Sequence, residues 1–272
     1  VIIIFPLNGN NMEYMDFYVS LAGFFFSLLI LWSGVGAGVL VIPTLITLFH
    51  IDPLVAVASG SAFAFISKIL MTLGHAKHGS VNWRAAIQFL SICLPITVAT
   101  AATMAILSQT HQGPMLELTL VVAIIMAGSL ALIALLSARI KTIISTWPMS
   151  SLSGVTGLLM GLTGVGGGVM VVPALATTGG LPIKIAVATS IPIGLILSLA
   201  VSITLGSSGL LDYPLILSLM LGAIIAIPLG TRMFHLFSDR LIKQITCGLI
   251  GLALIDLMIQ AIDLATQVSS SS

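Results

Sequence analysis

Residues 161–175 read "GLTGVGGGVMVVPAL", and residues 31–45 read the related string "LWSGVGAGVLVIPTL". Each string places several glycines and one proline inside an apolar run. Glycine weakens a helix interior and permits backbone conformations that residues with a Cβ avoid. We therefore expect two broken helices, with Pro43 and Pro173 as terminating residues.

The composition places the chain in a lipid bilayer. Of its 272 residues, 58% are hydrophobic and only 6% are charged. A soluble domain could not cover so much apolar surface with polar groups, so we predict an all-α polytopic membrane protein. The nine Lys and Arg residues are scattered, whereas binding of phosphate backbones needs them clustered. Nucleic acid is therefore excluded as a partner.

The apolar segments set the number of membrane crossings. A spanning helix needs about 20 apolar residues. The chain has eight apolar segments, at residues 17–49, 54–73, 84–108, 115–137, 149–178, 184–205, 214–234 and 244–262. Six have the length of one crossing, whereas the first and fifth are longer and contain the glycine strings.

The two strings belong to an internal repeat. A shift of 130 residues without a gap aligns "GVGAG" with "GVGGG", Pro43 with Pro173, and "AVAS" at 56–59 with "AVAT" at 186–189. We therefore predict two four-segment repeats. The predicted boundaries are a tail at 1–16, a first repeat at 17–137, a cytoplasmic loop at 138–148, a second repeat at 149–263 and a tail at 264–272. Either tail could be non-native, and neither is assigned a function.

The positive charges indicate how the repeats are oriented. Lys and Arg favour cytoplasmic loops. If segments one and five are re-entrant hairpins, eight of the nine fall on one face, namely Lys77, Arg84, Arg139, Lys141, Lys184, Arg232, Arg240 and Lys243. Each half then has three crossings, so the halves are inverted, with six full crossings and both termini on the extracytoplasmic side of the cell membrane. Eight plain spans remain the alternative.

Broken helices in inverted repeats indicate a binding site near the membrane midplane. A half-helix that leaves a glycine string begins with unpaired N–H groups and a partial positive charge, which suits an anion. Matching hydroxyl residues supply further donors. The substrate-binding candidates are Ser33, Gly34, Gly36, Gly38, Ser59, Thr163, Gly164, Gly166, Gly167, Gly168, Thr189 and Ser190.

Packing is the competing explanation for these residue types. Small residues often let membrane helices approach closely, and we expect this role for Gly157 with Gly161 and for Gly248 with Gly251. Ser and Thr in membrane helices often donate to their own backbone carbonyls. Duplication of the glycine string favours a ligand site.

Lys68 is the clearest basic residue inside a predicted span. An intramembrane charge is a functional candidate, so we assign Lys68, together with Pro43 and Pro173, a gating or charge role. Lys68 lies about five residues, or about 7–8 Å of helix rise, from the inner end of its segment, so extension to the interface explains it equally well. Its matched position in the second repeat is Ser198.

The chain lacks the residue patterns of an intramembrane enzyme. The histidines do not gather, and no carboxylate pair, GxSxG or HExxH motif occurs in a predicted span. We therefore expect no catalytic residues, no metal site and no cofactor.

The doubled string, the "AVAS" and "AVATS" runs and the loops with Asn82 or Asp212 resemble the TauE/SafE family of sulfite exporters. The resemblance covers most of residues 20–262. It implies transport of sulfite, organosulfonates or related small anions, coupled to an ion gradient such as that of protons or sodium. The sequence departs from the family at Ala37, where the second repeat has Gly167 and the family usually has glycine.

The expected function is a secondary transporter that holds a small anion at the glycine strings and works by alternating access. A passive anion channel and a non-transporting membrane scaffold are the alternatives. Homo-oligomerisation stays open at this point.

Overall fold

The computed structural model describes residues 10–33, 37–77, 81–110, 114–136, 147–164, 170–233 and 239–271. Within these residues the secondary structure is helical and contains no strand. The helices are α1 Asn10–Ser33, α2 Ala37–Phe49, α3 Pro53–Lys77, α4 Trp83–Thr110, α5 Pro114–Leu136, α7 Met149–Thr163, α8 Val171–Thr177, α9 Ile183–Gly206, α10 Tyr213–Met233 and α11 Asp239–Ser271. The all-helical prediction is confirmed.

Side-chain caps begin three of the helices. The Asp52 carboxylate accepts the Leu54 N–H (2.9 Å) at the start of α3. Asn82 and Asp212 act in the same way before α4 and α10, where each side-chain oxygen accepts the amide three residues later at 3.0 Å. Pro53 opens α3 at a position where a missing N–H costs nothing. Local sequence therefore determines where these helices start.

Several helices are long and apolar. Among the described residues, three are long and apolar enough to cross a membrane, namely Trp83–Gln109, Ile185–Gly206 and Tyr213–Gly230. Shorter apolar helices occur at Phe17–Leu31, Gly38–Phe49, Pro53–Ile69, Glu117–Leu130 and Met149–Thr163. Such helices are those of a membrane-embedded protein.

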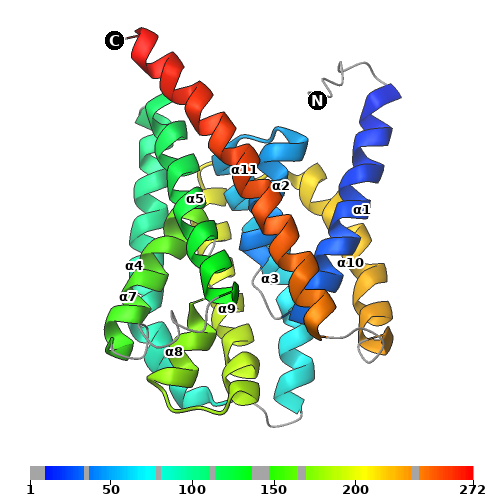
Figure 1. Ribbon diagram of the computed structural model, residues 1–272, viewed down its shortest axis with the longest axis vertical. Helices are drawn as coiled ribbons and strands as arrows, with labels where there is room; N and C mark the ends of the chain where they lie inside the picture. The colour runs from blue at the N-terminus through cyan, green and yellow to red at the C-terminus, as the bar shows by residue number, and fades with distance from the viewer. Residues whose placement is uncertain are drawn as a thin grey trace.

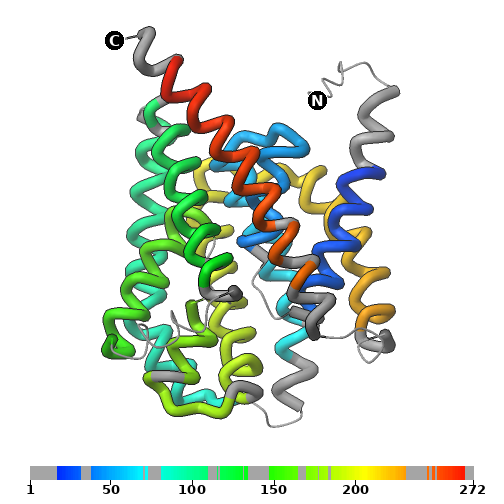
Figure 2. Tube along the Cα trace, in the orientation of Figure 1, coloured from blue at the N-terminus to red at the C-terminus, as the bar shows by residue number. Residues whose placement is uncertain are grey.

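The first and second halves of the chain are interleaved. α3 packs against α9, α1 against α10, α7 against α4, and α5 against α11. In Figure 1, α2 lies toward the upper end of the molecule and α8 toward the lower end. Figure 2 shows that α3 runs downward and α9 upward, so the two helices are antiparallel. The beginning of α1 and the end of α11 both lie at the upper end.

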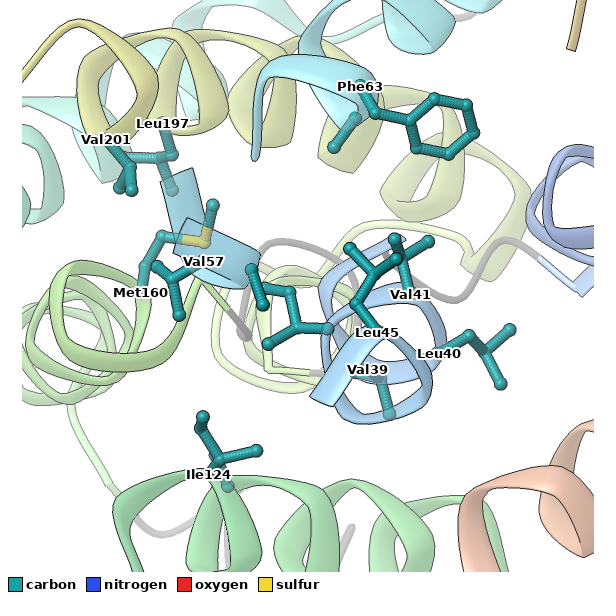
Figure 3. Packing of buried hydrophobic residues seen from close by; sticks show 14 of the residues in the cluster. Val39, Leu40, Val41, Leu45, Val57, Phe63, Ile124, Met160, Leu197 and Val201 are labelled. Atoms are coloured by element: carbon teal, nitrogen blue, oxygen red, sulfur yellow. The ribbon is translucent and has the colours of Figure 1, made fainter. Parts of the chain in front are cut away.

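The short helix α2 lies in the core of the protein. Its residues Val39, Val41 and Leu45 are buried, and Figure 3 shows them in one cluster of buried hydrophobic residues with Val57 of α3. An apolar helix without a polar face is stable where other parts of the protein or lipid cover it. The sequence of α2, "AGVLVIPTLITLF", has no charged residue, which fits this position.

Glycines set the distance between α7 and α4. A Cβ added at Gly157 would lie 2.6 Å from the Cys93 carbonyl oxygen, and one at Gly161 would lie 2.6 Å from the Thr97 carbonyl oxygen. The packing prediction for Gly157 and Gly161 is therefore confirmed. The prediction is wrong for Gly248 and Gly251, because no described atom lies within 4 Å of a Cβ at either position.

Candidate functional site

The described helices end before each glycine string and resume after it. α1 ends at Ser33 and α2 begins at Ala37, whereas α7 ends at Thr163 and α8 begins at Val171. The candidates Gly34, Gly36, Gly166, Gly167 and Gly168 lie outside the described residues. The site is therefore built from the residues that flank the two strings.

Gly164 turns the chain at the end of α7. Its backbone is left-handed, with φ 64° and ψ 0°, and its N–H donates to the Met160 carbonyl at 2.9 Å. This conformation is typical of a glycine that caps a helix C-terminus, because a Cβ would be strained there. The break at the second string thus has a local cause in the sequence.

Gly164 also lies against the helix that leaves the first string. A Cβ added to it would lie 2.5 Å from Ile42 Cδ1, 3.0 Å from Ser61 Oγ and 3.3 Å from Val57 Cγ1. Ile42 belongs to α2, and the other two residues belong to α3. Residues next to the two strings, far apart in sequence, therefore meet inside the protein.

Ser61 is a polar residue of this region that the sequence did not single out. Its side chain is only 2% exposed, and its hydroxyl has no hydrogen-bond partner among the described residues. A buried hydroxyl without a partner is costly, so Ser61 is a candidate donor to a ligand. Its match in the second repeat is Ile191, and for this reason the repeat did not identify it.

Ser59 and Thr189 occupy matched positions and make matched hydrogen bonds. The Asp212 N–H donates to Ser59 Oγ at 3.0 Å, and the Asn82 N–H donates to Thr189 Oγ1 at 2.9 Å. Asn82 and Asp212 are themselves 130 residues apart, as are Ser59 and Thr189. We call these two bonds the crossed loop bonds. Each ties a helix of one half to the loop before a helix of the other half.

The other predicted hydroxyls bond within their own helices. Thr163 Oγ1 donates to the Leu159 carbonyl at 2.7 Å, and Ser190 Oγ donates to the Val187 carbonyl at 2.8 Å. Ser33 is the last residue of α1. A proton given to the backbone is unavailable to a ligand, so Ser190 and Thr163 have weaker claims as anion donors than Ser59 and Thr189.

The prolines do not terminate the helices that follow the strings. Pro43 lies inside α2, and Pro173 is the third residue of α8. Pro173 lies in the first turn of its helix, where its missing N–H has no partner to lose. The expectation that these prolines end the broken helices is therefore wrong. Gly38 is buried near the start of α2.

The two half-helices differ in length. α2 has 13 residues, whereas α8 has only 7. The partial charge at a helix N-terminus arises from aligned peptide dipoles, which a helix of two turns can sum only in part. The N-terminus of α2 therefore carries the larger partial positive charge of the two.

Lys68 is buried in α3 rather than extended to the surface. Its side chain is 7% exposed, and its ammonium donates to Ser198 Oγ at 3.2 Å. Lys68 and Ser198 are the matched positions of the two repeats, so α3 and α9 contact each other at equivalent points. The interpretation that Lys68 reaches the membrane interface is not supported by this burial.

Comparison with known proteins identifies the family. A probable membrane transporter protein of Bacillus subtilis is 26% identical over 258 residues, which cover 89% of this chain and 100% of that protein. One from Methanocaldococcus jannaschii is 28% identical over 251 residues, covering 85% of this chain and 91% of its own. No solved structure matches the chain.

Both relatives are described as transporters, in agreement with a membrane protein that is not an enzyme. The family described as sulfite exporter TauE/SafE matches residues 19–257, which is most of the chain and includes both glycine strings. The chain therefore belongs to the TauE/SafE family of sulfite exporters.

Proposed function

We propose that the protein is a secondary transporter of a small anion, which binds where the two broken helices meet. The observation that carries this proposal is the buried, unpartnered hydroxyl of Ser61 beside the left-handed Gly164. Both lie next to α2, whose N-terminus follows the first glycine string. A helix N-terminus and a free hydroxyl together suit an oxyanion.

Ser59 and Thr189 would supply further donors, one toward each end of the α3 and α9 pair. Each hydroxyl oxygen accepts a loop N–H, and each still holds a proton that it can donate. Ser59 lies two residues from Ser61 and would join the same site, whereas Thr189 would meet the anion only as it passes the opposite end. We keep both residues as substrate-binding candidates on this ground.

The positions of the helix ends support an inverted-repeat topology with re-entrant hairpins. Six of the eight basic residues outside Lys68 adjoin the end of α3, the starts of α4, α9 and α11, and the end of α10, all toward the lower end in Figure 1. Basic residues favour the cytoplasm, so we assign the lower end to the cytoplasm and both termini to the extracytoplasmic side. α2 then enters from outside and α8 from inside.

This topology suggests a mechanism of alternating access. The crossed loop bonds lie at opposite ends of the antiparallel pair α3 and α9, so each would close one side of the site. Breaking one bond while keeping the other would expose the anion to one side at a time. The family name points to sulfite or a related sulfonate as substrate, with a proton or sodium ion as the coupling ion.

A thermal-shift screen on purified protein tests the binding step. The anions are sulfite, sulfate, thiosulfate, taurine, sulfoacetate and small carboxylates. A ligand at 100 times its Kd stabilises the folded state by about 2.7 kcal/mol, so binding raises the melting temperature. No shift with any anion would favour a non-transporting scaffold.

Proteoliposomes test the transport step. We expect accumulation of the binding anion against its gradient, whereas a channel could only equilibrate it. Gly168→Val places a branched side chain in the second string, and we expect it to abolish accumulation in a protein that still elutes as one species in detergent. Unchanged transport by this variant would remove the second string from the mechanism.

A further inference from the structure

We infer that Lys68 provides the positive charge for the transported anion and releases its proton when the site is empty, so that each anion crosses with a proton. This inference rests on the proposed function and names its coupling ion. The proton comes from water on the side where the anion enters. It returns to water on the side where the anion leaves, so that mass and charge balance.

The described hydrogen bond of Lys68 is with a neutral group. Its side chain is 7% exposed, and its ammonium donates to Ser198 Oγ at 3.2 Å. The adjacent residue Ser67 is also buried, and its hydroxyl has no hydrogen-bond partner within the described part of the chain. Among the described residues, no carboxylate forms an ion pair or hydrogen bond with Lys68.

Among the side chains that the structure describes on the neighbouring helices, no titratable group hydrogen-bonds to Lys68. α2, α5, α9 and α10 pack against α3. Their titratable or charged residues, with those of α3 itself, are Glu117, Lys184, Tyr213, Arg232, His75 and Lys77. Glu117 and Tyr213 have described side chains, and neither hydrogen-bonds to Lys68; the Tyr213 side chain is largely exposed.

Lys68 shares a helix face with the candidate anion site. Positions 57, 61 and 68 of α3 follow the i, i+4, i+11 spacing that places side chains on one face. Val57 and Ser61 contact Gly164 on that face. Lys68 lies two turns further, or about 10 Å along the axis, and its Cα–Cβ bond tilts back toward Ser61. One face of α3 thus presents a free hydroxyl and a buried amine.

The energetics of a buried charge link the proton to the anion. An ammonium without a counter-charge is costly in a low-dielectric interior, and this cost falls when an anion lies nearby. Lysine can lose its proton when buried, whereas arginine keeps its charge. The empty site therefore favours the neutral amine, and the occupied site favours the ammonium with the anion.

The place of Lys68 in the fold suits such a carrier. Because Lys68 and Ser198 are matched positions of the two repeats, their contact lies where the halves meet, between the two crossed loop bonds. A proton held there can be exposed to either side as one bond or the other opens. A lysine near one end of the bundle would meet only one side.

The first experiment needs no variant. Proteoliposomes with an internal pH dye take up radiolabelled sulfate, thiosulfate or sulfoacetate, whose charges do not change near neutral pH. We expect uptake to acidify the lumen and an imposed proton gradient to drive accumulation. Accumulation without proton movement would overturn the inference while leaving the transporter intact. Failure to accumulate these three anions and sulfite would remove the proposed function, and this inference with it.

Two variants then assign the proton to Lys68. Lys68→Arg keeps the charge permanently, so we expect it to exchange internal for external anion but to lose proton-driven accumulation at least tenfold. Lys68→Met removes the charge at similar length, so we expect the anion-induced thermal shift to disappear. Ser67→Ala leaves Lys68 and its hydrogen bond to Ser198 in place, so it should retain proton-driven uptake. The assignment of the proton to Lys68 would be overturned if Lys68→Arg accumulated the anion with the wild-type number of protons per anion. A wild-type anion-induced thermal shift in Lys68→Met would also overturn it.

Discussion

At the scale of single residues, Gly164 is constrained both by its left-handed backbone and by close neighbours. The other described left-handed glycines share only the first of these constraints. Gly164, Gly180 and Gly209 all have positive φ, at 64°, 63° and 77°. Around Gly180 and Gly209 no described atom lies within 4 Å of an added Cβ, whereas Gly164 faces Ile42 and Ser61. Substitution of Gly164 is therefore restricted both by its left-handed backbone and by the side chains of Ile42 and Ser61 beside it.

The pair Gly164→Ala and Gly180→Ala separates these two constraints. An alanine in the left-handed region costs about 1–2 kcal/mol, so both variants should melt at a lower temperature than the wild type. Only Gly164→Ala also pushes against Ile42 and Ser61, so we expect it alone to lose the anion-induced thermal shift. Equal loss of that shift in Gly180→Ala would show that it reflects general destabilisation.

Ser61→Ala tests whether the unpartnered hydroxyl binds substrate. Its hydroxyl has no described partner, so its removal should leave the melting temperature of the empty protein unchanged or raise it. A hydrogen bond to a charged ligand contributes about 1.5–3 kcal/mol, so we expect the Kd of the bound anion to rise at least tenfold. The measurement is a titration of the thermal shift.

Ser67→Ala is the matched control for Ser61→Ala. Ser67 is equally buried on α3, and its hydroxyl is equally unpartnered. It is six residues from Ser61, so the two do not share a helix face. We expect the anion Kd of Ser67→Ala to stay within twofold of the wild type. A larger rise than in Ser61→Ala would place the anion on the other face of α3.

At the scale of helices, glycines set the close contact of α7 with α4. We expect Gly161→Ala to lower the melting temperature in detergent, because the added Cβ would lie 2.6 Å from the Thr97 carbonyl oxygen. Gly251→Ala in α11 is the control, since no described atom would meet its Cβ and alanine favours the helix by about 1 kcal/mol. A higher melting temperature for Gly161→Ala than for Gly251→Ala would contradict this view of the α4 and α7 interface.

Helix breaks could be predicted from the sequence, but helix faces could not. Glycines and capping residues act locally, so "GVGGG" indicated the interruption that Gly164 begins. Gly157 and Gly251 both have mainly apolar sequence neighbours, and only the fold shows that one faces α4 and the other faces no described atom. The free hydroxyl of Ser61 could not be recognised because its neighbour Gly164 is about a hundred residues away in sequence. Periodicity carries little information when nearly every position is apolar.

At the scale of the whole molecule, the interleaving of the two halves places one crossed loop bond at each end of the α3 and α9 pair. In the proposed mechanism each bond closes one side of the anion site. Asp212 donates to Ser59 at one end of the α3 and α9 pair, and Asn82 donates to Thr189 at the other. The 130-residue repeat aligned Ser59 with Thr189, but it could not show that each would bond to the opposite half. The bonds arise because α3 packs against α9.

Hydrogen exchange of Ser59→Ala and Thr189→Val tests whether the two closures alternate. Loss of one hydrogen bond of about 1 kcal/mol should speed exchange of its donor amide about fivefold, so Ser59→Ala should expose Asp212 and Thr189→Val should expose Asn82. If opening one end favours the state in which the other end is closed, the opposite amide should exchange more slowly than in the wild type. In a rigid protein, each substitution would change the exchange rate of the nearer amide only. Faster exchange at both ends in either variant would mean that the helices loosen together, which is incompatible with a transporter that opens one side at a time.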